Sequence, residues 1–182
     1  MNEVVVFIFF LILFYPFHLV KIIDSGKFYG ALSLQFVEII ARSSKDASTL
    51  KLVLYNGANG RTYRSLALSD EQAFTISDAG SGFLIYTAFI PLQNGPADGI
   101  ALVSGKDGKF EVLQFLSYEG TVKATDGPTK GMESVDIVAK ETDESSDHDS
   151  VGLGGRGIGK FEWRKFTGKA SPGKLNIGQK IY

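Results

Sequence analysis

The densest group of potential metal ligands lies in an acidic stretch in the last third of the chain. Residues 140–150 read K-E-T-D-E-S-S-D-H-D-S and contain no apolar side chain. Hard cations such as Ca²⁺ bind several carboxylate oxygens that converge from one shaped loop. The stretch lacks the fixed spacing and the glycine of a known calcium loop, so we favour a solvated acidic loop over a calcium site. The candidate metal ligands are Asp143, Glu144, Asp147 and Asp149, with His148 among them.

A glycine-rich stretch follows and formally matches two nucleotide-binding motifs. Residues 152–157 read G-L-G-G-R-G, which fits G-x-G-x-x-G, and residues 154–160 fit G-x-x-x-x-G-K. The first motif needs a βαβ unit, and the second needs Ser or Thr after the lysine, where this chain has Phe161. We therefore interpret the stretch as a structural glycine turn and predict no cofactor.

Side chains for nucleophilic or acid–base catalysis are few. The two histidines are His18, in an apolar run, and His148, in the acidic stretch, and no serine lies in a G-x-S-x-G elbow. Glu38 and Glu119 form a carboxylate pair only if the fold brings them together, and we favour a partnered or rim position for Glu38. We interpret Asp98 as a turn cap before a strand. The sequence thus predicts a protein that is not an enzyme.

Composition indicates the fold class. The 182 residues are 44% hydrophobic with a net charge of −1, which suits one domain with a core and argues against a strongly basic nucleic-acid binder. The chain has 21 glycines and 14 phenylalanines but few long helical patterns, which predicts an all-β protein with many turns. It has no cysteine, which excludes disulfides and thiolate metal sites.

About eight short apolar segments, separated by turns every ten or so residues, predict a β-sandwich. At its centre we expect a hairpin in which residues 100–103 and 110–116 flank the turn G-K-D-G at 105–108. Residues 110–116 are apolar on both parities, so we expect a central strand covered on both faces. The other predicted strands are residues 32–41, 50–55, 61–68, 82–90, 134–138 at an edge, and 161–166.

Three aromatic residues, Tyr55, Tyr118 and Trp163, are interpreted as core or rim side chains rather than a ligand-stacking platform.

The apolar run at residues 4–20 has three interpretations. It contains no charged side chain, but it is slightly shorter than the ~20 residues of a membrane span and lacks both a basic n-region and an A-x-A cleavage site. It is a signal peptide or signal anchor, a buried strand of the fold, or a mispredicted start of the protein. We favour the first, which predicts a secreted or membrane-anchored protein.

Six groups of residues, taken in order, resemble the lamin-tail-like domain over roughly residues 32–180. They are F-V-E-I at 36–39, L-V-L-Y-N-G at 52–57, Q-N-G at 93–95 with D-G-I-A-L at 98–102, Q-F-L-S-Y-E-G at 114–120, F-x-W at 161–163, and S-P-G at 171–173 with N-I-G-Q at 176–179. The resemblance implies an immunoglobulin-like β-sandwich at residues 30–180 behind an apolar segment at residues 1–28. The chain departs from the family at its start, where M-N-E-V echoes the usual I-N-E-I but an apolar run replaces the loop that follows. If that run is wrongly translated, the first strand is damaged and the sandwich has a poorly paired edge.

Members of this family act as an interaction module in nuclear lamins and accompany extracellular nucleases and phosphoesterases in secreted bacterial proteins. The resemblance therefore implies a non-catalytic binding or targeting module, secreted or membrane-tethered, with a protein or polymer partner. An alternative is an accessory domain of an extracellular nuclease or phosphoesterase system, which predicts a basic strip and salt-sensitive DNA binding. A third hypothesis, an enzyme, needs carboxylates clustered around Glu38 and Glu119. The candidate basic binding residues are Arg61, Arg64, Arg156, Lys160, Arg164 and Lys165.

Overall fold

A computed structural model describes residues 19–23, 35–42, 47–93, 95, 97–138, 149–157 and 161–182. Within these residues the chain forms eleven strands in two sheets, so the predicted all-β class is confirmed. One sheet contains β1 (Leu19–Ile23), β2 (Phe36–Ala41), β5 (Thr75–Gly80), β6 (Phe83–Phe89), β10 (Ser150–Gly155) and β11 (Phe161–Phe166). The other contains β3 (Leu50–Tyr55), β4 (Thr62–Ala67), β7 (Gly99–Lys106), β8 (Lys109–Ser117) and β9 (Val135–Asp136).

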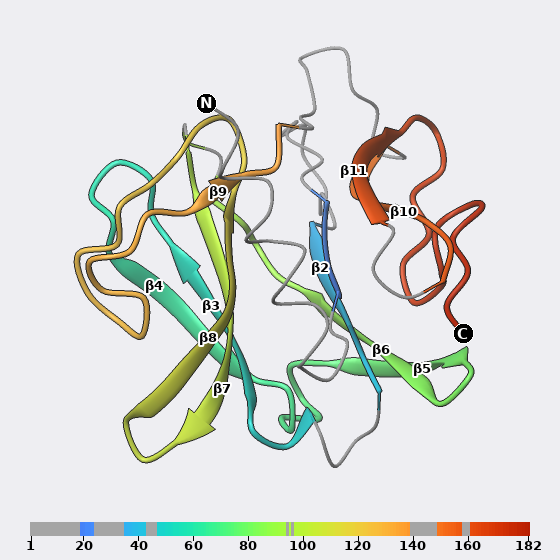
Figure 1. Cartoon of the computed structure of the whole chain (residues 1–182), viewed down its shortest axis with the longest axis horizontal. Coiled ribbons are helices and arrows are strands. Elements are labelled where there is room, and N and C mark those ends of the chain that lie inside the picture. The colour runs from blue at the N-terminus through green and yellow to red at the C-terminus, as the bar shows by residue number, and fades with distance from the viewer. Residues whose placement is uncertain are drawn as a thin grey trace.

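The two sheets face each other, with the strand orders β11-β10-β1-β2-β6-β5 and β4-β3-β7-β8-β9 (Figure 1). Neighbouring strands are antiparallel except for β9, which is a short edge strand parallel to β8. The predicted edge strand at residues 134–138 is therefore confirmed. Among the described residues, no helix is long and apolar enough to cross a membrane.

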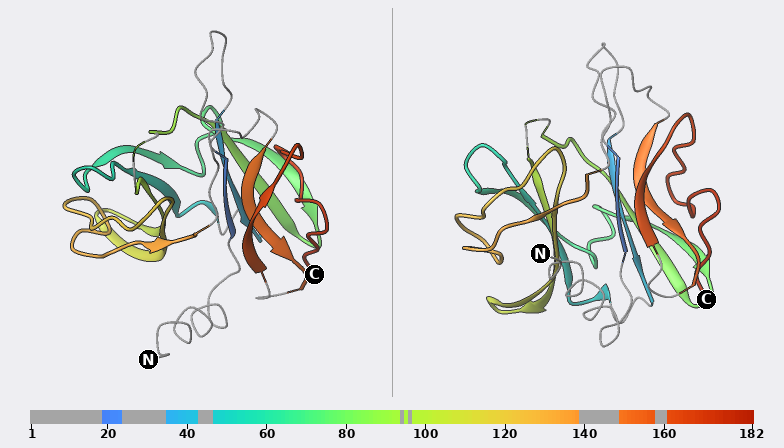
Figure 2. Two further views of the ribbon diagram at one scale, coloured as in Figure 1. Left: turned by 90° about the horizontal axis from the view of Figure 1, so that it is seen from above. Right: turned by 45° about the horizontal axis from the view of Figure 1, so that its top comes forward.

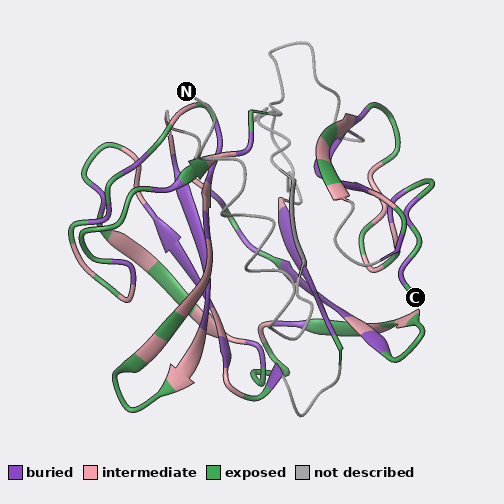
Figure 3. Ribbon diagram, in the orientation of Figure 1, coloured by how far each residue is buried: buried purple, intermediate pink, exposed green. Residues whose placement is uncertain are grey.

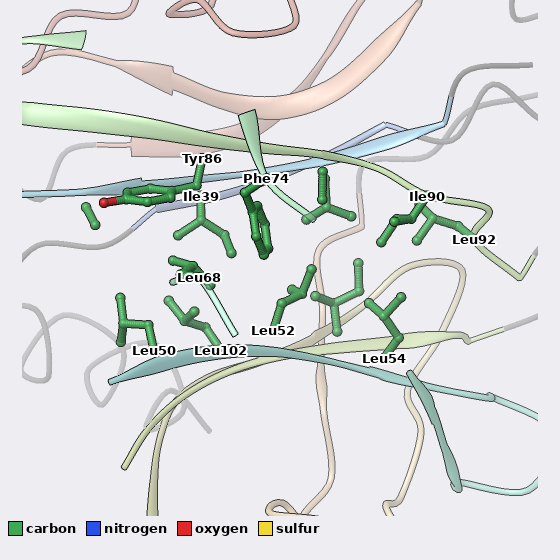
Figure 4. Close-up of a cluster of buried hydrophobic side chains, with 14 of the residues drawn as sticks. Ile39, Leu50, Leu52, Leu54, Leu68, Phe74, Tyr86, Ile90, Leu92 and Leu102 are labelled. Atoms are coloured by element: carbon green, nitrogen blue, oxygen red, sulfur yellow. The ribbon is translucent and has the colours of Figure 1, made fainter. Parts of the chain in front are cut away.

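The main core lies between the sheets (Figure 4). Leu50, Leu52 and Leu54 of β3 point into it, as the alternation of residues 50–55 predicts. From the opposite sheet, Ile39 and Tyr86 meet them, and each of these five side chains is at most 2% exposed. Burial of these large apolar side chains contributes the main favourable free energy of folding.

The hairpin of β7 and β8 forms around Asp107 and Gly108, whose positive φ angles of 54° and 79° suit the predicted tight turn. β7 is buried on both faces, whereas most side chains of β8 are half-buried. Leu113 and Leu116 of β8 pack against the core between the sheets, and Phe110, Val112 and Phe115 pack in a second apolar cluster on the outer face. The prediction that residues 110–116 contact apolar neighbours on both faces is therefore confirmed, although Phe115 is the one residue of this segment that is buried. The register shifts beside Leu102, which leaves Leu113 as an extra, bulged residue. The bulge changes the face on which the following residues lie and produces apolar residues on both parities.

The end of the predicted apolar run enters the six-stranded sheet. Leu19 and Val20 belong to β1, which pairs with β2 on one side and with β10 on the other. The position of Leu19 and Val20 in β1 agrees with the interpretation of the apolar run as a buried strand. The rest of the run, residues 4–18, lies outside the described residues. Since β1 has a partner on each side, no sheet edge forms there. The division between residues 1–28 and 30–180 stays a prediction.

Two smaller apolar clusters lie on the outer faces of the sheets. On the five-stranded sheet, Val122 and Ala124 from the loop after β8 cover Val53, Tyr55 and Ala101. On the six-stranded sheet, Ile181 from the C-terminal segment joins a cluster that contains Ile40, Phe83, Ile85 and Leu153. The buried side chains of both sheets therefore extend beyond the space between them (Figure 3).

Candidate functional site

Glu38 is a buried carboxylate on the outer face of the six-stranded sheet. Its neighbours on β2, Val37 and Ile39, enter the main core, so the alternation of the strand directs Glu38 outward. Its side chain is 1% exposed. Oε1 accepts a hydrogen bond of 2.9 Å from Thr87 Oγ1 on β6 and another from the backbone N–H of Gly173. The interpretation of Glu38 as a partnered strand residue is confirmed.

Asp98 is a second buried carboxylate and lies directly before β7. Its Oδ2 accepts a hydrogen bond of 2.8 Å from the N–H of Gly95, three residues earlier, as expected of a turn cap. Its Oδ1 accepts one of 2.6 Å from the N–H of Gly57, in the turn between β3 and β4. Asp98 therefore caps its own turn, as predicted, and also ties that turn to a second one.

Asp149 is the one acidic residue of the stretch at residues 140–150 that the structure describes. It is 2% exposed, its Oδ1 accepts a hydrogen bond of 2.7 Å from the N–H of Gly168, and its Oδ2 lies 3.1 Å from Lys165 Nζ. These contacts tie Asp149 to the end of the β10–β11 hairpin. No group of three or more potential metal ligands occurs in the described part of the chain. The calcium interpretation stays untested, because Asp143, Glu144, Asp147 and His148 lie outside the described residues.

The candidate basic residues fall into two groups. Arg61 and Arg64 are exposed at β4, on an edge of the five-stranded sheet. Arg156, Arg164 and Lys165 belong to the β10–β11 region of the other sheet. Figure 1 and Figure 2 show β4 and β11 on opposite sides of the molecule. The structure therefore does not align these residues in one strip.

Acidic neighbours lower the effective charge of two members of the second group, Arg164 and Lys165. Arg164 Nη2 lies 3.2 Å from Glu162 Oε2, and Lys165 forms the ion pair with Asp149. Lys160 lies outside the described residues. The first group, at β4, therefore presents the clearer positive charge.

The glycine-rich stretch forms a strand rather than a turn. Residues 152–155 belong to β10, which pairs with β11 along its whole length. A Cβ atom on Gly154 would lie 2.8 Å from the end of the Arg164 side chain, so this flexible side chain passes close over the strand and would shift if residue 154 were larger. Our prediction of a glycine turn is wrong for these residues. No βαβ unit surrounds them in the described sheets, as the motif would require.

The three singled-out aromatic residues pack in the core or at its rim, as predicted. Tyr55 is fully buried, and its hydroxyl accepts a hydrogen bond of 3.2 Å from the N–H of Thr129. The hydroxyl of Tyr118 donates one of 2.7 Å to the carbonyl of Gln93. Trp163 is half-buried and contacts both the main core and the outer cluster of its sheet. None of the three forms an open stacking platform.

The carboxylates required by the enzyme hypothesis belong to different parts of the fold. Glu38 is on β2, whereas Glu119 is exposed in the loop after β8 and has a positive φ of 62°. The two histidines, His18 and His148, lie outside the described residues. Within the described part, the structure supplies no paired acid and base around Glu38.

Several polar side chains connect distant segments by hydrogen bonds, and the sequence analysis did not identify them as candidate site residues. Gln93 accepts a hydrogen bond of 2.6 Å from Asn56 Nδ2 through its side chain, besides the one from Tyr118. Asn176 Nδ2 donates one of 3.0 Å to the carbonyl of Leu153. All except Leu153 lie in segments that carry the resemblance to the lamin-tail-like domain. That resemblance is the one signal in the sequence that pointed to them.

The geometry thus defines an all-β protein of two facing sheets whose buried carboxylates bind backbone N–H groups of turns and loops. Comparison of the chain with models of protein families, with curated proteins and with solved structures finds no match.

Proposed function

We propose that the chain is a lamin-tail-like domain of the immunoglobulin-like β-sandwich type. The observation that carries the proposal is that the segments behind the resemblance contact one another. Glu38 in F-V-E-I accepts the N–H of Gly173 in S-P-G. Asp98 in D-G-I-A-L accepts the N–H groups of Gly57 in L-V-L-Y-N-G and Gly95 in Q-N-G. Residues far apart in the sequence thus meet as hydrogen-bond partners, as expected if the segments belong to one structural signature.

The function that we propose is a non-catalytic binding or targeting module, secreted or membrane-tethered, with a protein or polymer partner. The use of the buried carboxylates supports it. Glu38, Asp98 and Asp149 each accept backbone hydrogen bonds from loops, which is a structural role. A carboxylate whose oxygens accept N–H groups of the protein's own loops is held by those loops and is not presented to a substrate.

The proposal is tested with the intact protein as bait in its native source. We expect a partner whose capture saturates and is competed by soluble protein, and no hydrolysis of DNA or of a phosphodiester probe. Hydrolysis that disappears on Glu119→Gln would contradict a non-catalytic module, since this exposed residue can change without loss of the core. A reporter fused after residue 30 tests the location, and a wholly cytosolic product would contradict export.

One observation favours the nuclease-associated alternative, namely that Arg61 and Arg64 are exposed together at the edge strand β4. Lys and Arg that contact phosphates release counterions, so binding weakens steeply with salt. A gel shift with duplex DNA at low and moderate salt measures this. Salt-sensitive binding that weakens on Arg61→Gln, but not on the matched Arg164→Gln, would favour the alternative, and no shift at low salt would end it.

A further inference from the structure

The C-terminal strap, residues 171–182, crosses the outer face of the six-stranded sheet (Figure 2). Near its start, the N–H of Gly173 donates to Glu38 on β2, and the carbonyl of Gly173 accepts a hydrogen bond of 2.7 Å from Ser77 Oγ on β5. Near its end, the N–H of Lys180 donates to the carbonyl of Gly155, at 3.0 Å, at the end of β10. The strap therefore connects strands that are far apart in the strand order of the sheet.

The middle of the strap has its own folded turn. The N–H of Gln179 donates to the carbonyl of Asn176 at 2.9 Å, and the N–H of Asn176 donates to Gln179 Oε1 at 3.0 Å. Asn176 also reaches Leu153 on β10. These short-range bonds hold the turn together independently of the sheets, so the strap can keep its shape when it moves.

The strap has few apolar anchors. Ile181 is its only buried apolar side chain, at 6% exposure, and Leu175 is partly buried beside it. No residue of the strap belongs to the main core between the sheets. Segments with few buried apolar contacts open at a lower free energy than the global unfolding free energy. Beneath the strap lie Ile40, Phe83, Ile85 and Leu153.

We infer that the strap opens as one unit while both sheets stay folded, and that its opening uncovers the apolar surface formed by Ile40, Phe83, Ile85 and Leu153. Glu38 loses its bond to Gly173 in the same step and becomes accessible. The strap is thus a conformational device that covers an apolar surface with a carboxylate at its border. This inference does not depend on the proposed function.

Hydrogen exchange of the full chain, followed by NMR, measures the opening. Three amides report on the strap, and we call them the strap amides because each takes part in a hydrogen bond between the strap and the sheet. They are those of Gly173 and Lys180, within the strap, and that of Gly157, which donates to the carbonyl of Lys180 at 2.9 Å. The amide of Leu68, bonded to the carbonyl of Leu50 at 3.0 Å, reports on the other sheet. We expect the three strap amides to share one opening equilibrium and to exchange at least about tenfold faster than Leu68 after correction for intrinsic rates.

Two isoleucines of the strap provide a matched pair of variants. Ile181 is 6% exposed and Ile177 is 60% exposed. Ile181→Ser should speed exchange of all three strap amides by a common factor of about ten or more, with Leu68 unchanged, because it removes the apolar anchor. Ile177→Ser should leave all four amides unchanged.

Three results would overturn the inference. Equal acceleration of Leu68 by Ile181→Ser would show that the strap opens only when the whole protein unfolds. Acceleration at Lys180 and Gly157 without Gly173 would show that the two ends open separately. No acceleration at any strap amide would show that Ile181 does not anchor the strap.

Discussion

Removal of the Asp98 carboxylate should destabilise the protein strongly. Asp98→Ala takes away the acceptors of two backbone N–H groups, those of Gly57 at 2.6 Å and Gly95 at 2.8 Å, at a site that is 2% exposed. Two hydrogen bonds to a charged group, at roughly 1.5–3 kcal/mol each, give about 3–6 kcal/mol. Relief from burying a charge offsets part of this, so we expect a net loss of about 2–4 kcal/mol in the free energy of unfolding. Asp98→Asn keeps one acceptor oxygen and should cost about half as much.

Urea denaturation followed by the fluorescence of Trp163 measures this loss as a lower transition midpoint with an unchanged m-value. Asp70→Ala is the matched control, because Asp70 also accepts a backbone N–H, from Gln72 at 3.0 Å, but is exposed. We expect the control to change the unfolding free energy by less than about 0.5 kcal/mol. If Asp98→Ala costs no more than Asp70→Ala, the reasoning that buried carboxylates hold these turns is refuted.

Two further predictions concern close packing and metal binding. Gly99→Ala would place a Cβ atom 2.9 Å from Val122 in a packed cluster, so it should lower the free energy of unfolding by about 1–3 kcal/mol in the same urea assay. Gly154→Ala meets only the half-exposed side chain of Arg164, which can swing away, so its cost should be under about 1 kcal/mol, and equal costs would contradict this account. Calcium added to the full chain should give no saturable change in the fluorescence of the single tryptophan, as expected of a solvated stretch at residues 140–150, whereas a saturable change would indicate a calcium site.

Local signals in the sequence predicted most strands but not all of them. The hairpin at Asp107 and Gly108 is recognisable because an Asp-Gly step lies between apolar segments. Ser81 and Gly82 form an equivalent turn between β5 and β6, with φ angles of 54° and 78°. Its first strand, Thr75–Gly80, was not predicted because the letters T-I-S-D-A-G show no apolar alternation. Pairing with β6, and not local propensity, makes this edge segment a strand.

Strand order could not be predicted from the sequence, because it depends on pairing between distant segments. Nothing in the letters of residues 19–23 places this strand between β2, the next strand in the chain, and β10, which begins only at Ser150. The glycines of β10 are the clearest case, since glycine is depleted in strands and normally indicates a turn. At Gly154 the nearest neighbour of an added Cβ atom is the side chain of Arg164, on the following strand.

In the candidate site, too, contacts between residues close in sequence were predictable, and contacts between distant residues were not. The turn-cap role of Asp98 was predictable because Gly95 is three residues away, whereas its second partner, Gly57, is 41 residues away. For Glu38, the strand pattern predicted a polar residue that needs a partner, but not that Gly173, 135 residues later, would supply one. Chemistry restricts what a buried carboxylate requires, and only the fold determines which N–H group provides it.

The buried carboxylates of the described residues share one structural use. All three in the described part, Glu38, Asp98 and Asp149, accept N–H groups from glycines. Loops that cross a sheet carry N–H groups that no strand can pair, and each must still find an acceptor. At Gly168 and Gly173, φ angles of 63° and 73° belong to a conformation that other residues rarely adopt, and there glycine presents its N–H to the acid. Because the fold uses its buried acids in this way, the binding function that we propose would depend on exposed side chains or on the surface that the proposed opening of the strap uncovers.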